Sequence, residues 1–221
     1  MATTFTNLLA EVAHKPETAA ARYRGHVRRS AVEFVVALAM AAACGLLFWG
    51  SSFATTMVHD QLSQQKITFP AAGSAGFAAA DYPTLQQYAG QIVDNGPKAK
   101  AYANDYIGKH LKDVAGGKTY SEMSSQSRAA ATAAATAKTA NDPAYTDLQA
   151  KATTMSGQVD NLFRGETLRG LLLYAWGWWL VGRIAFYVAV VALIGAAVLL
   201  ALTVMGFLQA RKDHAALEAT R

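Results

Sequence analysis

Two long stretches almost without charge constrain the fold of this chain more than any other feature. Residues 32–58 hold one charged side chain, Glu33, and residues 171–210 hold one, Arg183. A helix needs about 20 apolar residues to cross a bilayer, and each stretch supplies them. Charged residues make up only 16% of the 221-residue chain, against roughly 25% in soluble domains. The sequence therefore predicts two membrane spans around a polar insert and excludes a wholly soluble enzyme.

The first apolar stretch is predicted to be an uncleaved signal anchor with its span at residues 31–54. Arg28 and Arg29 precede this span, and Trp49 lies in an aromatic belt near its far end, as is typical of membrane interfaces. A cleaved signal peptide ending at residues 52–54 is the competing interpretation. The polar leader and the apolar core are both long for a signal peptide, which favours the anchor.

The second apolar stretch is too long for one simple crossing. A helix over all of it would reach about 57 Å, whereas the hydrocarbon core of a bilayer is about 30 Å thick. We therefore divide it into an aromatic interfacial collar at residues 171–183 and a transmembrane helix at residues 184–208. Arg183 lies at the join, where an interfacial role is favoured over a functional intramembrane one. Its helical spacing from Trp176 and Trp179 permits a cation–π stack.

Basic residues beside the spans predict the orientation. The segment 1–30 carries five basic and two acidic side chains, and the tail 209–221 carries three basic and two acidic ones. Both are therefore expected on the cytoplasmic side of a cell membrane, with residues 55–170 extracytoplasmic. This accounts for the net charge of +5 without nucleic-acid binding. The residues assigned to the membrane interfaces are Arg28, Arg29, Trp49, Trp176, Trp178, Trp179, Arg183, Arg211 and Lys212.

The polar parts of the chain also show helical patterns, so the predicted fold is an all-α membrane protein. A short amphipathic helix is expected near the N-terminus, from the spacing of apolar residues at 5–12. In the insert, helices are predicted at 83–93 and 97–114, and one starts after a capping box at Thr119–Glu122. The predicted small core of the insert comprises Tyr82, Leu85, Tyr88, Ile92, Tyr102, Tyr106, Ile107, Leu111, Val114, Tyr145, Leu148, Val159, Leu162 and Phe163.

One stripe in the first span predicts contact with another helix. Ala37, Ala41 and Gly45 recur every four residues, and such small residues allow helices to approach closely in a membrane. General alanine richness of the chain is the competing explanation. Helix packing is therefore predicted at these three positions.

Few residues suggest chemistry. Met57, His59 and Asp60 cluster at the outer end of the first span and are weak candidates for a metal site. Ordinary interfacial polar residues are the favoured interpretation, because further ligands cannot be specified. The chain shows no nucleophile elbow, phosphate-binding glycine loop or paired cysteines. We expect no cofactor and no catalytic residue.

Two motifs carry a resemblance to a known family. They are GGKTYS at residues 116–121 and FRGETLRGLL at residues 163–172. With the two-span layout, they make the chain similar to an uncharacterised family of actinobacterial membrane proteins, often mislabelled automatically as aromatic-ring-opening dioxygenases. The resemblance implies a two-span membrane protein and carries no catalytic residues. No iron-binding set of histidines and carboxylates supports the dioxygenase label.

These observations predict a non-catalytic accessory or structural subunit of a larger membrane-protein complex. Helix packing in the bilayer and the outer helical domain would hold it there. The expected partners are the lipid bilayer and other membrane-protein subunits. The alternative is an extracytoplasmic sensor or ligand-binding module that signals through a partner.

Overall fold

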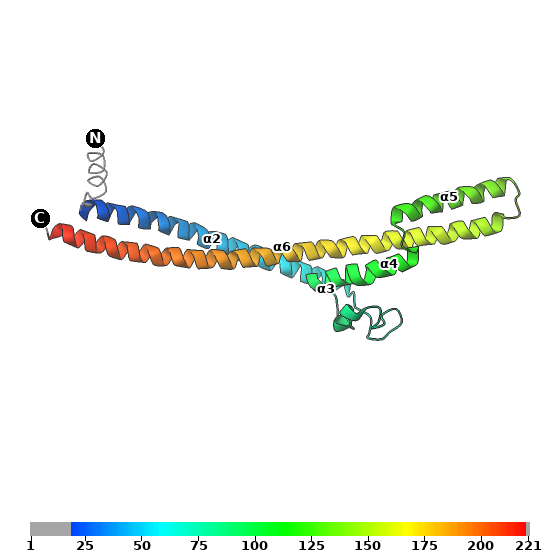
Figure 1. The fold of residues 1–221 in the computed structure, drawn as a ribbon, viewed down its shortest axis with the longest axis horizontal. Coiled ribbons are helices and arrows are strands. Elements are labelled where there is room, and N and C mark those ends of the chain that lie inside the picture. The colour runs from blue at the N-terminus through cyan, green and yellow to red at the C-terminus, as the bar shows by residue number, and fades with distance from the viewer. Residues whose placement is uncertain (1–18, 220–221) are drawn as a thin grey trace, which may run out of the picture. The chain divides into compact units, whose positions relative to one another are not determined.

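The computed structural model describes residues 19–219, which are very largely helical (Figure 1). This part of the chain contains no strand, only an isolated bridge between Thr68 and Ile92. The all-α class is therefore confirmed, while the amphipathic helix predicted at 5–12 lies outside the described residues. The elements are α2 (Ala19–Gln65), the 3-10 helix η1 (Pro83–Tyr88), α3 (Gly96–Ala101), the π-helix η2 (Tyr102–Ile107), α4 (Gly108–Ala115), α5 (Tyr120–Thr139) and α6 (Tyr145–Glu218).

Two of these helices, α2 and α6, are long and apolar enough to cross a membrane. Only 11% and 17% of their most apolar windows are buried, whereas the core helix of a soluble protein buries most of its apolar surface. The chain forms two compact units. We call residues 19–49 with 185–219 the helix-pair unit, and residues 50–184 the insert unit.

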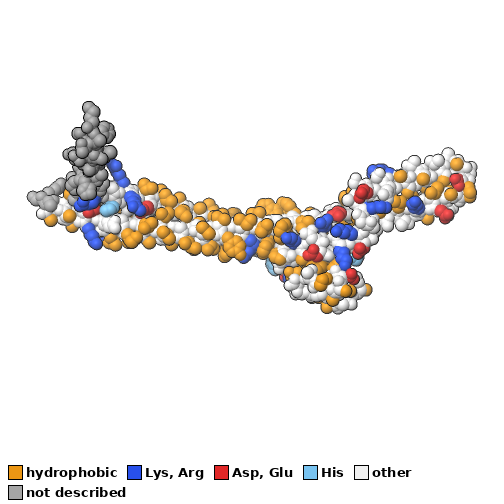
Figure 2. Space-filling view, in the orientation of Figure 1, with side chains coloured by type: hydrophobic (Ala, Val, Ile, Leu, Met, Phe, Trp, Pro, Cys, Tyr) orange, Lys and Arg blue, Asp and Glu red, His pale blue; other side chains and the backbone are white. Residues whose placement is uncertain are grey.

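The surface of the helix-pair unit is largely apolar. In Figure 2, hydrophobic side chains cover most of the visible face of its two helices, and charged side chains gather towards the chain ends. Exposure of such a surface to water is unfavourable, because burial of each apolar side chain would lower the free energy. The large exposed side chains of this unit include Val32, Val35, Leu46, Trp49, Val191, Ile194, Val198 and Val204.

The insert unit has a small core of its own, which a non-helical segment completes. Residues 67–70 pair with residues 90–93, with Val93 N donating to Ile67 O at 2.8 Å and Phe69 N to Gln91 O at 2.9 Å. Phe69 and Phe77 are 1% and 0% exposed. The other buried members are Val58, Leu62, Tyr82, Leu85, Val93, Ala99, Ala103, Ile107, Leu111, Ala115, Met123, Leu162 and Leu172.

Part of the predicted insert structure is wrong. The helix expected over 83–93 ends at Tyr88, because the chain turns at Gly90 with a φ of 70° to pair with the preceding segment. This pairing leaves Ile92 at the edge with an exposed side chain. Phe163, also expected in the core, is 59% exposed, since α6 faces the core with Leu162 instead. Five other predicted core residues are buried: Tyr82, Leu85, Ile107, Leu111 and Leu162.

Aromatic rings link the non-helical segment to the π-helix η2. Phe69 lies 5.0 Å from Tyr102, and Phe77 lies 5.7 Å from Tyr106, between ring centroids. Tyr82 stacks on Phe77 at 5.4 Å. Burial raises the pKa of the Tyr82 and Tyr102 hydroxyls. Aromatic contact at these distances adds to the stabilisation from burial alone, so these rings hold the segment against the helix.

The helix ends predicted around residue 116 are confirmed. Gly116 and Gly117 adopt left-handed backbone conformations, with φ of 58° and 80°, which end α4 as glycine readily does. The capping box then starts α5: Glu122 N donates to Thr119 Oγ1 at 3.3 Å, and Thr119 N to Glu122 Oε2 at 2.8 Å. These hydrogen bonds hold the pKa of the Glu122 carboxyl below its usual range. GGKTYS therefore has a structural role at a helix junction.

We expect Phe77→Ala to destabilise the insert unit by about 3 kcal/mol or more, because it removes a fully buried ring. Urea unfolding of the full chain, followed by near-UV circular dichroism, measures this loss. Phe163→Ala is the matched control and should cost about 1 kcal/mol or less, because that ring is largely exposed. Equal losses in the two variants would contradict the described core.

Candidate functional site

The helix-pair unit is built on small residues that recur every seventh position on both helices. On α2 the buried residues are Ser30, Ala37 and Cys44, between 1% and 4% exposed. On α6 they are Ala189, Ala196, Thr203 and Ala210, between 0% and 4% exposed. A seven-residue step turns an α-helix through nearly two full turns, so these residues lie on one face. Small side chains on facing stripes let the two backbones approach closely.

Glycines and a sulfur atom show how close the approach is. A Cβ added to Gly206 would collide with Ser30 Oγ, and one added to Gly195 would lie 2.6 Å from Met40 Cε. The Cys44 thiol donates a hydrogen bond to the carbonyl of Ala189 at 3.3 Å. Cys44, a free and buried cysteine, thus contacts the backbone of the other helix. A larger side chain at Gly195 or Gly206 would require Met40 or Ser30 to move.

Only one residue of the predicted small-residue stripe lies in the contact between α2 and α6. Ala37 is 1% exposed and packs in the helix pair, but Ala41 and Gly45 are exposed. A Cβ added to Gly45 would meet no atom nearby. The reason is geometric: a four-residue step rotates about 40° around the helix, so the stripe leaves the face that α6 covers. Ala41 and Gly45 are left on the outer surface of α2.

Ion pairs join the charged ends of the helix-pair unit. His26 Nδ1 lies 2.9 Å from Asp213 Oδ2, and Arg22 Nε lies 3.7 Å from Asp213 Oδ1. Arg29 Nε donates to Glu33 Oε1 at 2.8 Å, so the only carboxylate in the first apolar stretch is paired. The other predicted interface cations here, Arg28, Arg211 and Lys212, are exposed. Trp49 is 68% exposed.

The predicted aromatic collar is a continuous part of α6. Arg183 lies over the ring of Trp179, with its guanidinium carbon 5.8 Å from the centroid, which confirms one half of the expected stack. Lys100 Nζ lies 4.6 Å from the centroid of the Trp176 ring. Trp178 is 41% exposed and meets Tyr174 edge to face.

Two glycines fix the insert unit to α6. A Cβ on Gly96, at the start of α3, would lie 2.5 Å from Trp179 Cγ. A Cβ on Gly165 would lie within the side chain of Leu111 of α4. Arg169 also reaches from α6 towards η2, where its Nη2 donates to Asn104 Oδ1 at 3.2 Å. The collar and FRGETLRGLL therefore contact the rest of the insert unit.

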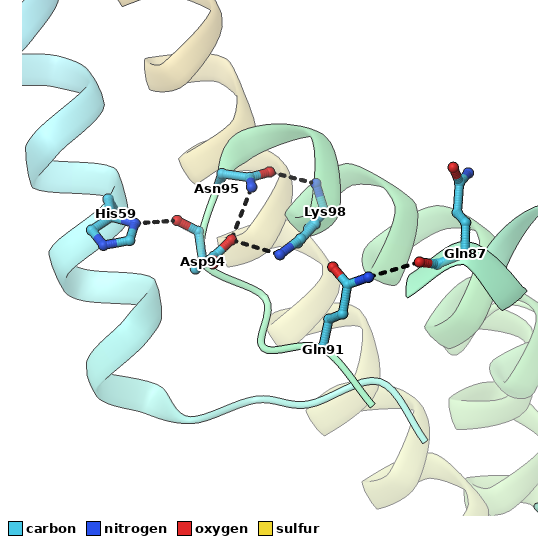
Figure 3. A network of polar contacts seen from close by, with 6 residues as sticks. All are labelled: His59, Gln87, Gln91, Asp94, Asn95 and Lys98. Atoms are coloured by element: carbon cyan, nitrogen blue, oxygen red, sulfur yellow. Dashed lines mark hydrogen bonds and ion pairs between the residues drawn. The ribbon is translucent and has the colours of Figure 1, made fainter. Parts of the chain in front are cut away.

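One of the weak metal candidates, His59, makes a contact that positions a helix. His59 Nδ1 lies 3.0 Å from the carbonyl of Asp94, and Asp94 pairs with Lys98 at 3.1 Å. Asn95 accepts from Lys98 N at 3.0 Å and so caps α3 (Figure 3). Among residues 19–219, no group of three histidines, cysteines or carboxylates is placed to hold a metal ion.

Met57 and Asp60 take no part in this network. Met57 lines an apolar cavity of about 260 Å³ beside Leu172 and Trp178. Asp60 is exposed. The three candidates thus have separate environments, and His59 serves to dock the end of α2 onto the start of α3.

A polar pocket of about 320 Å³ lies between η1, η2, α4 and α6. Lys109 Nζ donates to Asp81 Oδ1 at 3.0 Å, and Arg169 Nη1 donates to Glu166 Oε2 at 3.3 Å. Arg169 Nε is buried without a hydrogen-bond partner in the described part of the chain. Lys112 and Asp105 complete the charged lining. This arrangement can accept a small polar ligand of mixed charge. Local sequence patterns do not predict the pocket, because its residues come from four separate elements.

No protein-family model matches the chain, and neither does any curated protein or solved structure.

We expect Ala196→Leu to separate the two helices, because the residue is 3% exposed at their contact. Overpacking of this kind costs about 1–3 kcal/mol, so the midpoint of thermal unfolding in detergent should fall. Ala197→Leu adds the same atoms one position away on the exposed face and should leave the midpoint almost unchanged. A larger loss from Ala197→Leu would refute the seven-residue contact.

Proposed function

We propose that the chain is a non-catalytic accessory or structural subunit of a larger membrane-protein complex. The observation that carries this proposal is the surface of the helix-pair unit. One face of each helix is buried in the pair, yet the remaining faces are apolar and exposed. A bilayer and a partner helix are the two environments that suit such a surface.

The exposed half of the small-residue stripe supports a partner helix. Ala41 and Gly45 lie outside the contact with α6, so a further helix has a smooth surface on which to pack. Large side chains would hinder that approach, whereas small ones permit it. We therefore assign these two positions to contact with another subunit.

The proposed orientation places both termini in the cytoplasm and residues 55–170 outside. Cations at the chain ends of the helix-pair unit support it, since Arg28, Arg211 and Lys212 are exposed there. On this proposal the collar tryptophans lie near the outer interface. The insert unit then forms an extracytoplasmic helical domain that presents its surface to partner subunits.

A structural rather than a catalytic role is supported by what the polar side chains do. His59 and Asn95 position α3, and Thr119 and Glu122 start α5. The two motifs behind the family resemblance also serve packing and helix capping. The relation to two-span actinobacterial membrane proteins stays a proposal that rests on these motifs and on the layout of the helices.

Purification of the tagged full chain in mild detergent should retrieve a stoichiometric partner. The double variant Ala41→Leu with Gly45→Leu should lower its yield about tenfold, which corresponds to about 1.4 kcal/mol, because the added side chains keep the partner helix away. Quantitative mass spectrometry of the eluate measures this yield.

The matched control is Ala39→Leu with Ala43→Leu, which has the same spacing on other exposed positions of α2. It should retain the partner, and both double variants should keep the thermal stability of the helix pair. A stable, monodisperse native monomer would contradict the proposal. Equal partner loss in both variants would contradict the assigned contact.

A further inference from the structure

A groove opens between α2 and α6 near the charged end of the helix-pair unit. Its volume is about 540 Å³, and its lining residues are Tyr23, Val27, Phe207, Ala210, Arg211 and His214. The rings of Tyr23 and His214 meet edge to face, with centroids 5.3 Å apart. The groove thus has an apolar part at Val27 and Phe207 and a polar, basic part at Arg211 and His214.

In the basic part, His214 Nδ1 lies 3.5 Å from Glu218 Oε1, whereas the two arginines beside the groove have no acidic partner among residues 19–219. Neither Arg211 nor Arg24 forms an ion pair with a described residue, and the Arg24 Nε contact is with the carbonyl of Ala20 at 3.3 Å. Arg24 lies three residues before Val27, so both are on the same side of α2. The nearby Asp213 is already bound to His26 and Arg22. Two guanidinium groups beside the groove therefore remain available to an anion.

The apolar part continues along the exposed surface of α6. Val204, Phe207 and Leu208 are 58%, 43% and 52% exposed, and they follow one another towards the middle of the predicted span. A ligand that fits this shape needs an anionic group at one end and a hydrocarbon chain at the other. An inorganic anion would leave the apolar part empty, and a neutral hydrocarbon would leave the cations unpaired.

We propose that this groove binds one anionic phospholipid. Its phosphate lies between Arg211 and Arg24, because guanidinium groups bind phosphate oxygens through paired hydrogen bonds. One acyl chain lies along Val27 and Phe207 towards Val204. The proposal rests on the membrane location proposed above, and it adds a specific lipid site to the general attraction between basic residues and anionic headgroups.

Native mass spectrometry of the full chain, loaded from micelles with phosphatidylglycerol or phosphatidylcholine, tests this site. The wild type should retain one phosphatidylglycerol and discriminate against phosphatidylcholine. Arg24→Gln with Arg211→Gln should weaken that retention about tenfold or more, because both phosphate ligands are removed.

The control Arg29→Gln with Lys212→Gln removes the same charge from the same end of the unit. Arg29 lines a different pocket, beside Ser30 and Glu33, and Lys212 is two residues after the buried Ala210, about 160° around α6 from the packed face. Neither residue lines the groove. The control should retain the lipid. Equal loss in the two double variants would show nonspecific attraction and overturn the site.

Two further measurements separate the remaining outcomes. Excess inorganic phosphate should not displace the lipid, and displacement would reassign the groove to a free anion. Flotation with phosphatidylcholine vesicles reports membrane insertion by itself. Failure of the wild type to float would overturn the proposed membrane location, whereas flotation without preference for phosphatidylglycerol would overturn the lipid site alone.

Discussion

Close approach of α2 and α6 is the constraint on which the helix-pair unit depends. Apolar side chains on every face could not by themselves select one face for contact, because the exposed faces are as apolar as the packed one. The size of the side chains determines instead which face of each helix is packed. Ser30, Ala37 and Cys44 meet a stripe of alanine and threonine on α6, and the bulky residues are directed outwards. Because α6 covers only this seven-residue stripe, Ala41 and Gly45 stay exposed.

In the insert unit, α3, η2 and α4 pack against α6. Gly165 admits Leu111, Trp179 covers Gly96, and Arg169 reaches Asn104 of the π-helix. Helices α3 and α4 are short, so neither would be stable alone. Their positions therefore depend on contacts with α6.

Much of the fold could be predicted because its signals are local. The two uncharged stretches, the Gly116–Gly117 stop and the Thr119–Glu122 capping box each depend on neighbouring residues. Phe69 and Phe77 were missed because they lie among glycine and alanine in a segment without periodicity, and only distant pairing buries them. The seven-residue spacing of small residues is readable in the sequence. It is hard to distinguish there, because alanine is abundant on every face and the four-residue stripe is equally regular.

The central claim is that the outer faces of α2 and α6 contact lipid while the small-residue stripe is shielded. Spin labels placed singly at Val36, Val191 and Val198 in vesicle-reconstituted protein measure this contact directly by electron paramagnetic resonance. The account predicts high accessibility to oxygen and low accessibility to a water-soluble nickel complex at all three positions. Strong relaxation by the nickel complex at Val191 and Val198 would contradict it.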